Sequence, residues 1–559
     1  MDKKDLVIYQ IWPRSFHDSN HDGIGDLQGI IQKLDYLQDL GIQFIWLSPV
    51  YQSPNHDYGY DIADYYQIHP DFGTMEDLEA LIAQSKQHNI GIIMDLVANH
   101  TSDEHPWFQA ALQDPTSKYR DYYYFRPGIQ SSNKHAPPNN WMSFFGGSSW
   151  QYDPSSEEYY LTQFTPHQCD LNWNNKEVRE EIYRIMQFYL DKGVAGFRLD
   201  VINTIDKIAS LESKDPHKKG LQFPAEYTID RPNVAHWLQE MRSQVVDHYE
   251  DCLLIGECVL VTKESAVVYT KPDPPKLDMV FQFDMMLLGC GELGKFDFRK
   301  GYHFTIRDLK QVLRSWQTTT LLNNGYLGNY ISNHDNPRPV SRFGNTKLYH
   351  KESAKCLAIL NFTLYGTPFL YQGEEIGMTN YSFKQKDWKD YEAHSVFQVL
   401  QSKMHLPKFL ARMVINKMTR DHARTPMQWS NEQYAGFSTV QPWMVVNPNY
   451  GTINVQDDLA SPDSIIACYK ALIALRKNYI ALREGNFEEL LTYHKQVFCF
   501  IRTHETQRIL VLLNLSQRSA SIEFTTPYTG TFLYSNYGGN KKLTPFMVLV
   551  PYEAILYQL

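Results

Sequence analysis

Short runs rich in β-branched and aromatic residues alternate with amphipathic helical patterns through most of the 559-residue chain. This alternation is typical of βα units that build a parallel sheet. Eight such runs occur, and eight parallel strands are the number that closes a (β/α)8 barrel, the TIM barrel of the α/β class. The expected strands are Leu6–Pro13, Gln43–Val50, Ile90–Val97, Val194–Asp200, Cys252–Cys258, Met279–Asp284, Leu327–Asp335 and Thr367–Gly373.

Two regions interrupt this rhythm. Residues 101–173 are rich in Pro, Asn, Gly, Ser and Tyr, which predicts a small domain B inserted after the third strand. Residues 479–559 change to closely spaced short strands, which predicts a C-terminal antiparallel β-domain, domain C. The catalytic barrel, domain A, then comprises residues 1–100 and 174–478, and the irregular stretch 210–233 is expected to lengthen its rim.

Composition excludes several classes of partner. The net charge of −10 provides no basic surface for nucleic acid or for an anionic membrane. No window approaches 18 consecutive apolar residues, and the first residues lack the apolar stretch of a secretory leader. We therefore expect a cytoplasmic protein, a monomer or weak dimer, that acts on a neutral small molecule without an organic cofactor.

Carboxylates stand at the ends of three expected strands. Strand four closes with Asp200, strand five with Glu257 and strand seven with Asp335, while strand three ends in the segment Asp95–His100. Barrel enzymes place their active sites at these strand ends. One such carboxylate could be a simple cap or ion pair, but four polar strand ends in register favour a site. Asp200 and Glu257, on neighbouring strands, suit the close pair of a retaining glycosidase.

Arg198 precedes Asp200 by two residues, so both side chains are expected on the same face of the strand. Its charge should keep a nucleophilic Asp200 ionised. A proton donor at Glu257 would instead need a raised pKa.

These segments resemble the ordered sequence regions of the α-amylase family of glycoside hydrolases, and the resemblance extends over essentially the whole chain. The segments Asp57–Asp61, Asp170–Trp173, Tyr371–Asn380 and Arg424–Trp429 resemble its oligo-1,6-glucosidase and α-glucosidase branch. The resemblance implies that Asp200 is the nucleophile, that Glu257 is the general acid/base, and that Asp335 holds ring hydroxyls in the transition state. It also implies the substrate-binding residues Asp57, Tyr60, His100, Arg198, Val201, His334 and Arg424.

Among these residues, the pair of Asp57 and Arg424 is implied to close the pocket around a terminal glucose, which makes an exo-acting enzyme. The alternative interpretation is two unrelated solvated charges. Val201 follows the nucleophile and is stiff at χ1, and relatives that prefer α-1,6 bonds tend to carry valine there. Core packing is the alternative role for this side chain. Cys169 and His422 depart from the branch pattern at positions expected near the pocket rim.

The loop Asp18–Asp26 spaces oxygen side chains as hard-cation sites do. It resembles the divalent-metal loop of the branch, which implies a structural Ca²⁺, or Mg²⁺, as the only cofactor. The implied ligands are Asp18, Asn20, Asp22, the Ile24 carbonyl and Asp26. The alternative is an Asx-rich turn that caps the following helix.

The function expected from this resemblance is retaining, exo-acting hydrolysis of terminal α-glucosidic bonds in short oligosaccharides, with α-1,6 bonds preferred. Two alternatives within the branch stay open: a sucrose isomerase or other transglucosylase, and a trehalose-6-phosphate hydrolase. A non-catalytic binding protein on this fold would lack the strand-end carboxylates.

Overall fold

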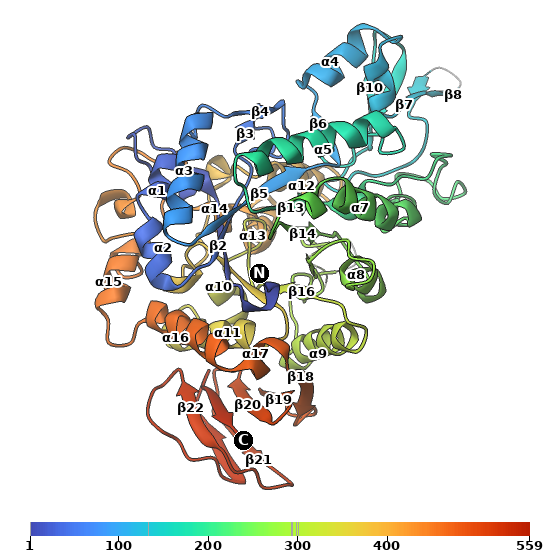
Figure 1. Ribbon diagram of the computed structural model, residues 1–559. Coiled ribbons are helices and arrows are strands. Elements are labelled where there is room, and N and C mark those ends of the chain that lie inside the picture. Colours follow the sequence, from blue (N-terminus) through green and yellow to red (C-terminus); the bar gives the residue numbers. More distant parts are fainter. Residues whose placement is uncertain (1, 132–133, 292–293, 298, 300) are drawn as a thin grey trace.

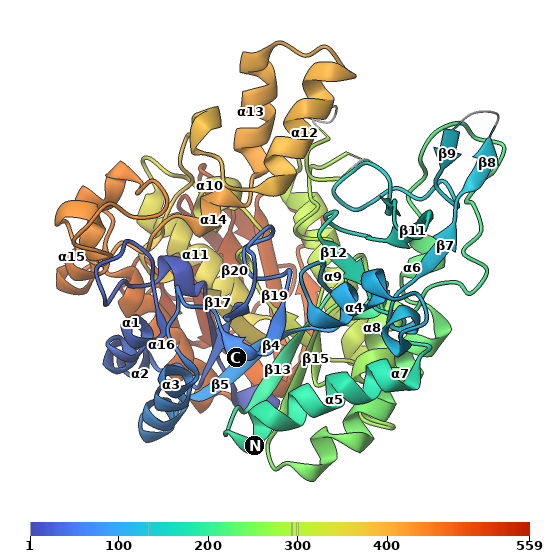
Figure 2. The ribbon, with the colours of Figure 1, turned by 90° about the horizontal axis from the view of Figure 1, so that it is seen from above.

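Eight parallel strands close a barrel at the centre of the molecule (Figures 1 and 2). The computed structural model describes residues 2–131, 134–291, 294–297, 299 and 301–559. The barrel strands are β1 (Ile8–Ile11), β2 (Phe44–Leu47), β5 (Gly91–Val97), β13 (Gly196–Asp200), β14 (Leu253–Glu257), β15 (Met279–Phe281), β16 (Leu327–Asn329) and β17 (Thr367–Tyr371). All eight predicted strands are confirmed. The seventh is shorter than predicted, because β16 ends at Asn329 and Asp335 lies in the loop beyond it.

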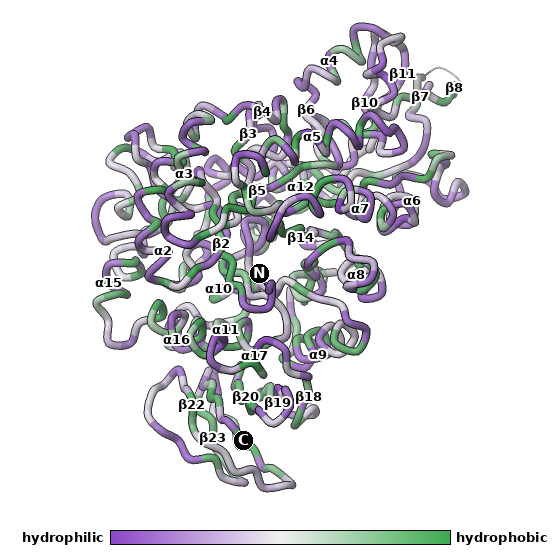
Figure 3. The backbone as a smooth tube through the Cα atoms, in the orientation of Figure 1, coloured by the Kyte–Doolittle hydropathy of each residue, from purple (hydrophilic) through white to green (hydrophobic). Residues whose placement is uncertain are grey.

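Helices cover the outside of the barrel, and their apolar faces pack onto the strands. The covering helices include α1 (Leu27–Ile31), α2 (Leu34–Leu40), α3 (Met75–Gln87), α5 (Lys176–Asp191), α7 (Pro232–Gln244), α8 (Lys263–Thr270), α9 (Ile306–Leu322), α11 (His350–Thr363) and α16 (Ile465–Asn478). The segment between β1 and β2 forms two helices, α1 and α2, because Lys33 leaves the helical conformation (φ −111°, ψ 8°) between them. Figure 3 shows green, hydrophobic stretches along the central strands and purple segments toward the outside. No helix in the described ranges is both long enough and apolar enough to cross a bilayer.

A separate group of short strands lies between β5 and α5. β6 (His100–Ser102) pairs antiparallel with β12 (Gln168–Asp170) and joins this segment to the barrel end. Beyond that pair, β7 (Phe125–Pro127), β11 (Glu158–Leu161) and β10 (Trp150–Asp153) form a three-stranded sheet. The sheet shares a small aromatic core with Leu211. The irregular stretch 210–233 therefore packs in part against this inserted segment.

A helical hairpin after β17 was not predicted. It consists of α12 (Tyr391–Ser402) and α13 (Lys408–Met418), which enclose their own apolar cluster. The hairpin projects from the barrel beside the inserted segment (Figure 2). The two touch where the Ser395 hydroxyl donates to the carbonyl of Phe145 at 3.2 Å. Both therefore rise above the C-terminal ends of the barrel strands.

The C-terminal residues form an antiparallel sheet at the opposite end of the molecule (Figure 1). Its strands are β18 (Asn486–Leu490), β19 (Val497–His504), β20 (Gln507–Asn514), β24 (Ala554–Gln558) and β22 (Thr531–Ser535), and β21 (Ala520–Glu523) pairs with β23 (Phe546–Leu549) in a second sheet. Alternation along β19 explains the packing, since successive side chains point to opposite faces. Phe498 and Phe500 join the barrel core, whereas Cys499 and Ile501 join the core between the two sheets.

Candidate active site

Three carboxylates at the C-terminal ends of β5, β13 and β14 meet at one guanidinium. Arg198 Nη1 lies 2.7 Å from Asp95 Oδ1 and 2.6 Å from Asp200 Oδ1, and Nη2 lies 2.6 Å from Glu257 Oε2. The arrangement follows from the sheet, because β13 lies between β5 and β14 and Arg198 is in register with Asp95. Arg198 and Asp200, two residues apart, share one face as predicted. The pairing with Asp95 was not predicted.

The charges of this cluster do not balance. Burial raises the pKa of Asp200, Glu257 and Asp95 raise it further, and Arg198 opposes the rise. Burial likewise raises the pKa of Asp95 to about 6 against the effect of Arg198. A fully ionised cluster would hold a net charge of about −2 in a buried place, which is strongly unfavourable. Burial therefore favours a proton shared among the coupled groups over full ionisation, so Arg198 does not by itself keep Asp200 ionised, contrary to expectation.

Val201 adopts a left-handed backbone conformation directly after Asp200, with φ 38° and ψ 38°. A β-branched residue in this region is a rare outlier, and such strain costs roughly 1–3 kcal/mol. Its backbone N–H donates to Glu257 Oε2 at 3.3 Å. This hydrogen bond therefore links the strained turn after β13 to the last residue of β14. No sequence pattern indicated this link.

Tyr60 and His334 connect the carboxylate cluster to Asp335. Tyr60 Oη lies 3.0 Å from Asp95 Oδ2 and 2.8 Å from His334 Nε2, and the two rings are parallel with centroids 5.3 Å apart. The amide of Gln10 donates to His334 Nδ1 at 2.7 Å, so we assign the ring proton to Nε2. Burial lowers the pKa of His334 to about 3, which keeps the ring neutral.

The predicted pair of Asp57 and Arg424 is not a direct ion pair. Asp57 Oδ1 instead lies 2.9 Å from Arg420 Nη2, and Arg424 Nη2 lies 2.9 Å from Asp335 Oδ1. Arg420 Nη1 is also 3.6 Å from Asp335, so Arg420 stands between the two carboxylates. Arg420 and Arg424 are four residues apart in a helical turn and project to the same side. Arg420 was missed, although its spacing from Arg424 was visible in the sequence.

Asp335 differs electrostatically from the carboxylates at Arg198. Burial would raise the pKa of Asp335, but the adjacent His334, followed by Arg420 and Arg424, outweighs it and holds the pKa well below its usual range. Its side chain is 31% exposed, in contrast to 8% for Asp200. A permanently ionised and accessible carboxylate is suited to bind hydroxyl groups and not to transfer a proton.

His100 lies near the site with both ring nitrogens engaged by protein groups. Its Nε2 is 3.0 Å from the carbonyl of Tyr60, and its Nδ1 is 3.1 Å from the Asn99 amide. Contact between His100 and substrate stays a prediction. Gln168, which sequence reasoning missed, has its amide 3.2 Å from the same carbonyl and 3.5 Å from Asp57.

Cys169 and His422 are not at the pocket rim, contrary to expectation. Cys169 is 0% exposed and His422 is 1% exposed. Cys169 is buried in the β6–β12 ladder, and His422 Nε2 lies 2.9 Å from the carbonyl of Asn416. Both therefore act through packing, because neither side chain is accessible to a sugar.

Replacement of His422 is expected to make the stability of the protein less sensitive to low pH. Burial lowers the pKa of His422 to about 4, so its unfolded form takes up a proton below about pH 6.5 while the native form does not. Native stability is therefore lost as pH falls from about 6.5 toward 4, by at most about 1.4 kcal/mol per pH unit for this group. The melting temperature of His422→Asn, measured against pH, should fall less steeply than that of the wild type.

His88→Asn is the control for this measurement. Hydrogen bonds to the Gln84 carbonyl and to Asp35 raise the pKa of His88. Replacement of His88 therefore cannot reduce the loss of stability at low pH. Equal slopes for His422→Asn and the wild type would show that His422 does not contribute to acid sensitivity.

A buried lysine connects the barrel to the inserted segment. Lys207 Nζ lies 2.8 Å from Asp170 Oδ1 and 2.8 Å from Asn99 Oδ1, and the lysine side chain is 0% exposed. Asp170 also accepts the backbone N–H of Gln163 at 2.7 Å. The ammonium thus binds one oxygen from each of the two parts of the chain. Asp170 was recognised as part of a motif, but its cationic partner was missed.

The loop Asp18–Asp26 folds around its own carboxylates. Asp18 accepts the backbone N–H of His21 at 2.8 Å and of Gly23 at 2.9 Å, and Asp26 caps α1 through the Gly29 N–H at 2.6 Å. The oxygen donors expected for Ca²⁺ are present on one loop. Among the described residues, however, Asp18, Asp22 and Asp26 do not form a group whose ligand atoms lie within 4.8 Å of one another. Cation binding by this loop therefore stays a prediction.

A parallel barrel with neighbouring carboxylates at the ends of β13 and β14 and an ionised carboxylate in the loop after β16 has the arrangement of a glycoside hydrolase active site. Residues 10–485 match the profile described as alpha amylase, catalytic domain. The oligo-1,6-glucosidase of Bacillus cereus is 44% identical over 562 residues, which cover 100% of this chain and 99% of that protein. The chain therefore belongs to the α-amylase family of glycoside hydrolases, family 13.

Solved structures agree with this assignment. The trehalose-6-phosphate hydrolase of Bacillus licheniformis superposes with a TM-score of 0.93 at 37% identity, over 99% of both chains. The isomaltulose synthase of Klebsiella sp. LX3 superposes with a TM-score of 0.94 at 37% identity, also over 99% of both chains. Likeness of fold alone does not separate the activities in those names, so substrate preference depends on the pocket.

Proposed function

We propose that this protein is a retaining, exo-acting α-glucosidase that hydrolyses terminal α-1,6-glucosidic bonds of short oligosaccharides. The observation that carries the retaining mechanism is the Arg198 guanidinium shared by Asp200 and Glu257. Two carboxylates bound to adjacent nitrogens of one planar group lie side by side. This suits the short separation of about 5–5.5 Å of a retaining pair.

In the proposed reaction, Asp200 attacks the anomeric carbon while Glu257 protonates the departing glycosidic oxygen. The bond to the leaving sugar breaks, and a β-glucosyl ester forms on Asp200. Glu257, now ionised, takes a proton from water, and the resulting attack on the ester releases α-glucose and restores both groups. The ionised Asp335 accepts hydrogen bonds from ring hydroxyls, which strengthen as charge develops on the ring.

The exo mode is supported by the charges that close one side of the site. Asp57, Arg420, Arg424 and Asp335 form a continuous set of ion pairs, with three of the four side chains at most 5% exposed. In the proposed enzyme, these ion-paired side chains close one end of the pocket, so that it binds a single terminal sugar and excludes an extended chain. Isomaltotetraose should therefore yield glucose and isomaltotriose as the first products, without early isomaltose. A rapid fall in the viscosity of a dextran solution would show internal cleavage and contradict the exo mode.

The similarity to the oligo-1,6-glucosidase of Bacillus cereus supports a preference for α-1,6 bonds. We propose that Val201 determines this preference. Val201→Thr keeps a β-branched side chain, so the strained backbone is unchanged and only a methyl becomes a hydroxyl. We expect the wild type to have a higher kcat/KM on isomaltose than on maltose, and this ratio to fall in the variant by roughly 10-fold. Steady-state kinetics on both disaccharides measure it. An unchanged ratio would remove Val201 as determinant.

The same assay, extended to sucrose and trehalose 6-phosphate with products identified, tests the overall assignment. Preferred cleavage of trehalose 6-phosphate, or conversion of sucrose into an isomeric disaccharide, would overturn the proposal in favour of the activities named for the structural relatives.

We also propose that the loop Asp18–Asp26 binds Ca²⁺ or Mg²⁺ in a structural role. The loop holds no group of the proposed reaction, so its ion would stabilise the native state by mass action. Chelation should lower the melting temperature while the activity at about 25 °C is retained, and added Ca²⁺ should restore the melting temperature. Identical melting curves with chelator and with Ca²⁺ would show that the loop is only a turn.

A further inference from the structure

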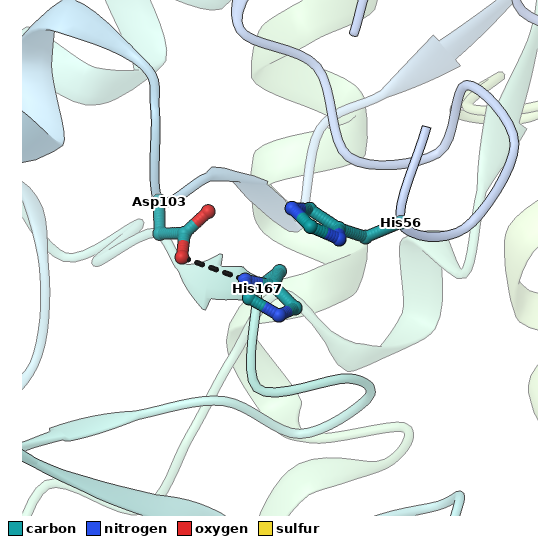
Figure 4. Close-up of side chains that lie close together, drawn as sticks. All are labelled: His56, Asp103 and His167. Carbon is teal, nitrogen blue, oxygen red and sulfur yellow. Dashed lines mark hydrogen bonds and ion pairs between the residues drawn. The ribbon is translucent and has the colours of Figure 1, made fainter. Parts of the chain in front are cut away.

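We propose that His56, Asp103 and His167 form a binding site for a divalent transition metal ion such as Zn²⁺, outside the catalytic cluster (Figure 4). One ligand atom from each residue lies within 4.8 Å of the others. No step of the proposed hydrolysis uses any of the three side chains. The site is also distinct from the oxygen-rich loop Asp18–Asp26.

The backbone holds all three residues in place. Asp103 and His167 flank the paired strands β6 and β12, and the Asp103 N–H donates to the His167 carbonyl at 3.0 Å. His56 lies in the loop between β3 (Tyr51–Gln52) and β4 (Asp64–Ile68), where its backbone N–H donates to Asp61 at 2.8 Å. Three segments distant in sequence therefore bring their side chains close together before any ion binds, which reduces the cost of binding.

The side chains already make contacts that bonds to a metal ion can replace. His167 Nδ1 lies 2.8 Å from Asp103 Oδ2, and the rings of His56 and His167 stack with centroids 3.7 Å apart and planes 10° apart. Stacked rings direct their lone pairs side by side, so a rotation of one ring is needed to aim both at one ion. His56 is exposed and can make this rotation into solvent.

The donor chemistry selects the class of ion. Two imidazole nitrogens and one carboxylate oxygen suit Zn²⁺, with water in the fourth position. Glu104 and Asp61 add negative charge near His167, which attracts a cation.

The position of the site connects it to the pocket. His56 precedes Asp57 and His167 precedes Gln168, and the Gln168 amide lies 3.5 Å from the Asp57 carboxylate. An ion held by both histidines would join the two segments that carry these side chains. Substrate binding and metal binding are therefore expected to be thermodynamically coupled.

Titration of the tag-free, full-length protein with Zn²⁺ tests the site. The protein is kept in a phosphine reductant, with excess Ca²⁺ to saturate the oxygen-rich loop. We expect one ion per chain by calorimetry, and visible absorption of a tetrahedral complex when Co²⁺ replaces Zn²⁺. Binding should be lost in His56→Asn and in His167→Asn, and weakened by roughly 10–100-fold in Asp103→Asn.

His88→Asn is the matched control, because His88 Nε2 pairs with Asp35 at 3.0 Å elsewhere on the surface. It should bind Zn²⁺ as the wild type does, and unchanged melting temperatures of the His56 and His167 variants in the absence of metal should show that they are folded. The proposal would be overturned if the wild type did not bind one Zn²⁺ per chain. It would also be overturned if the His56 and His167 variants bound Zn²⁺ as tightly as the wild type does. Neither result depends on which glucoside the enzyme cleaves.

Discussion

Asp200→Asn is expected to lower kcat by roughly 10⁴ or more, equivalent to about 5.5 kcal/mol of transition-state stabilisation. The amide has nearly the shape of the carboxylate but cannot form the glucosyl ester. Arg198 keeps Asp95 and Glu257 as partners in the variant, so the buried guanidinium is not left uncompensated. Single-turnover and steady-state hydrolysis of an aryl α-glucoside measure the loss, and an unchanged melting temperature shows that the fold is intact.

Azide distinguishes the roles of the two carboxylates by the configuration of the product. In Glu257→Ala, an activated aryl glucoside can still form the ester on Asp200, and azide attack on that ester gives α-glucosyl azide after two inversions. In Asp200→Gly, azide attacks the substrate directly and gives β-glucosyl azide after one inversion. Near-wild-type hydrolysis by pure Asp200→Asn, or the opposite azide anomers, would show that the nucleophile and acid have been misassigned.

The sequence was sufficient to predict the barrel because its strands are buried on both faces. Such strands appear as short, nearly continuous apolar runs, and the polar residues that close them are then conspicuous. Asp200 and Glu257 are the last residues of β13 and β14, as predicted. Asp335 was assigned to a strand end but lies in a loop, because the pairing of β16 with β17 ends at Asn329.

The contacts that the sequence did not predict all depend on tertiary geometry. The partner of Asp57 is Arg420 and not Arg424, a choice made by which residue of a short helical turn faces the carboxylate. The left-handed Val201 has no local signature, since glycine or asparagine usually marks such a position. The helices α12 and α13 pack onto an apolar cluster of their own, so their hydrophobic pattern resembles that of any pair of surface helices.

Lys207→Met is expected to destabilise the protein by roughly 3–5 kcal/mol, because it removes one partner of a buried ion pair. Methionine fills a similar volume, so the packing around the side chain is largely kept. Asp170, which is 0% exposed, would lose the ammonium that faces it at 2.8 Å. The inserted segment should separate first, which a lower melting temperature and faster proteolysis within residues 101–173 would report.

Two further variants make this result specific to the buried charge. Lys176→Met removes a surface lysine whose side chain is 75% exposed and pairs with Glu180, and it should cost about 0.5 kcal/mol or less. Asp170→Asn combined with Lys207→Met removes both charges, so it should be more stable than Lys207→Met alone and give a clear coupling in a double-mutant cycle. If Lys207→Met melts like Lys176→Met, the ammonium is not what holds the inserted segment to the barrel. If the double variant melts no higher than Lys207→Met, the loss comes from packing and not from the uncompensated carboxylate.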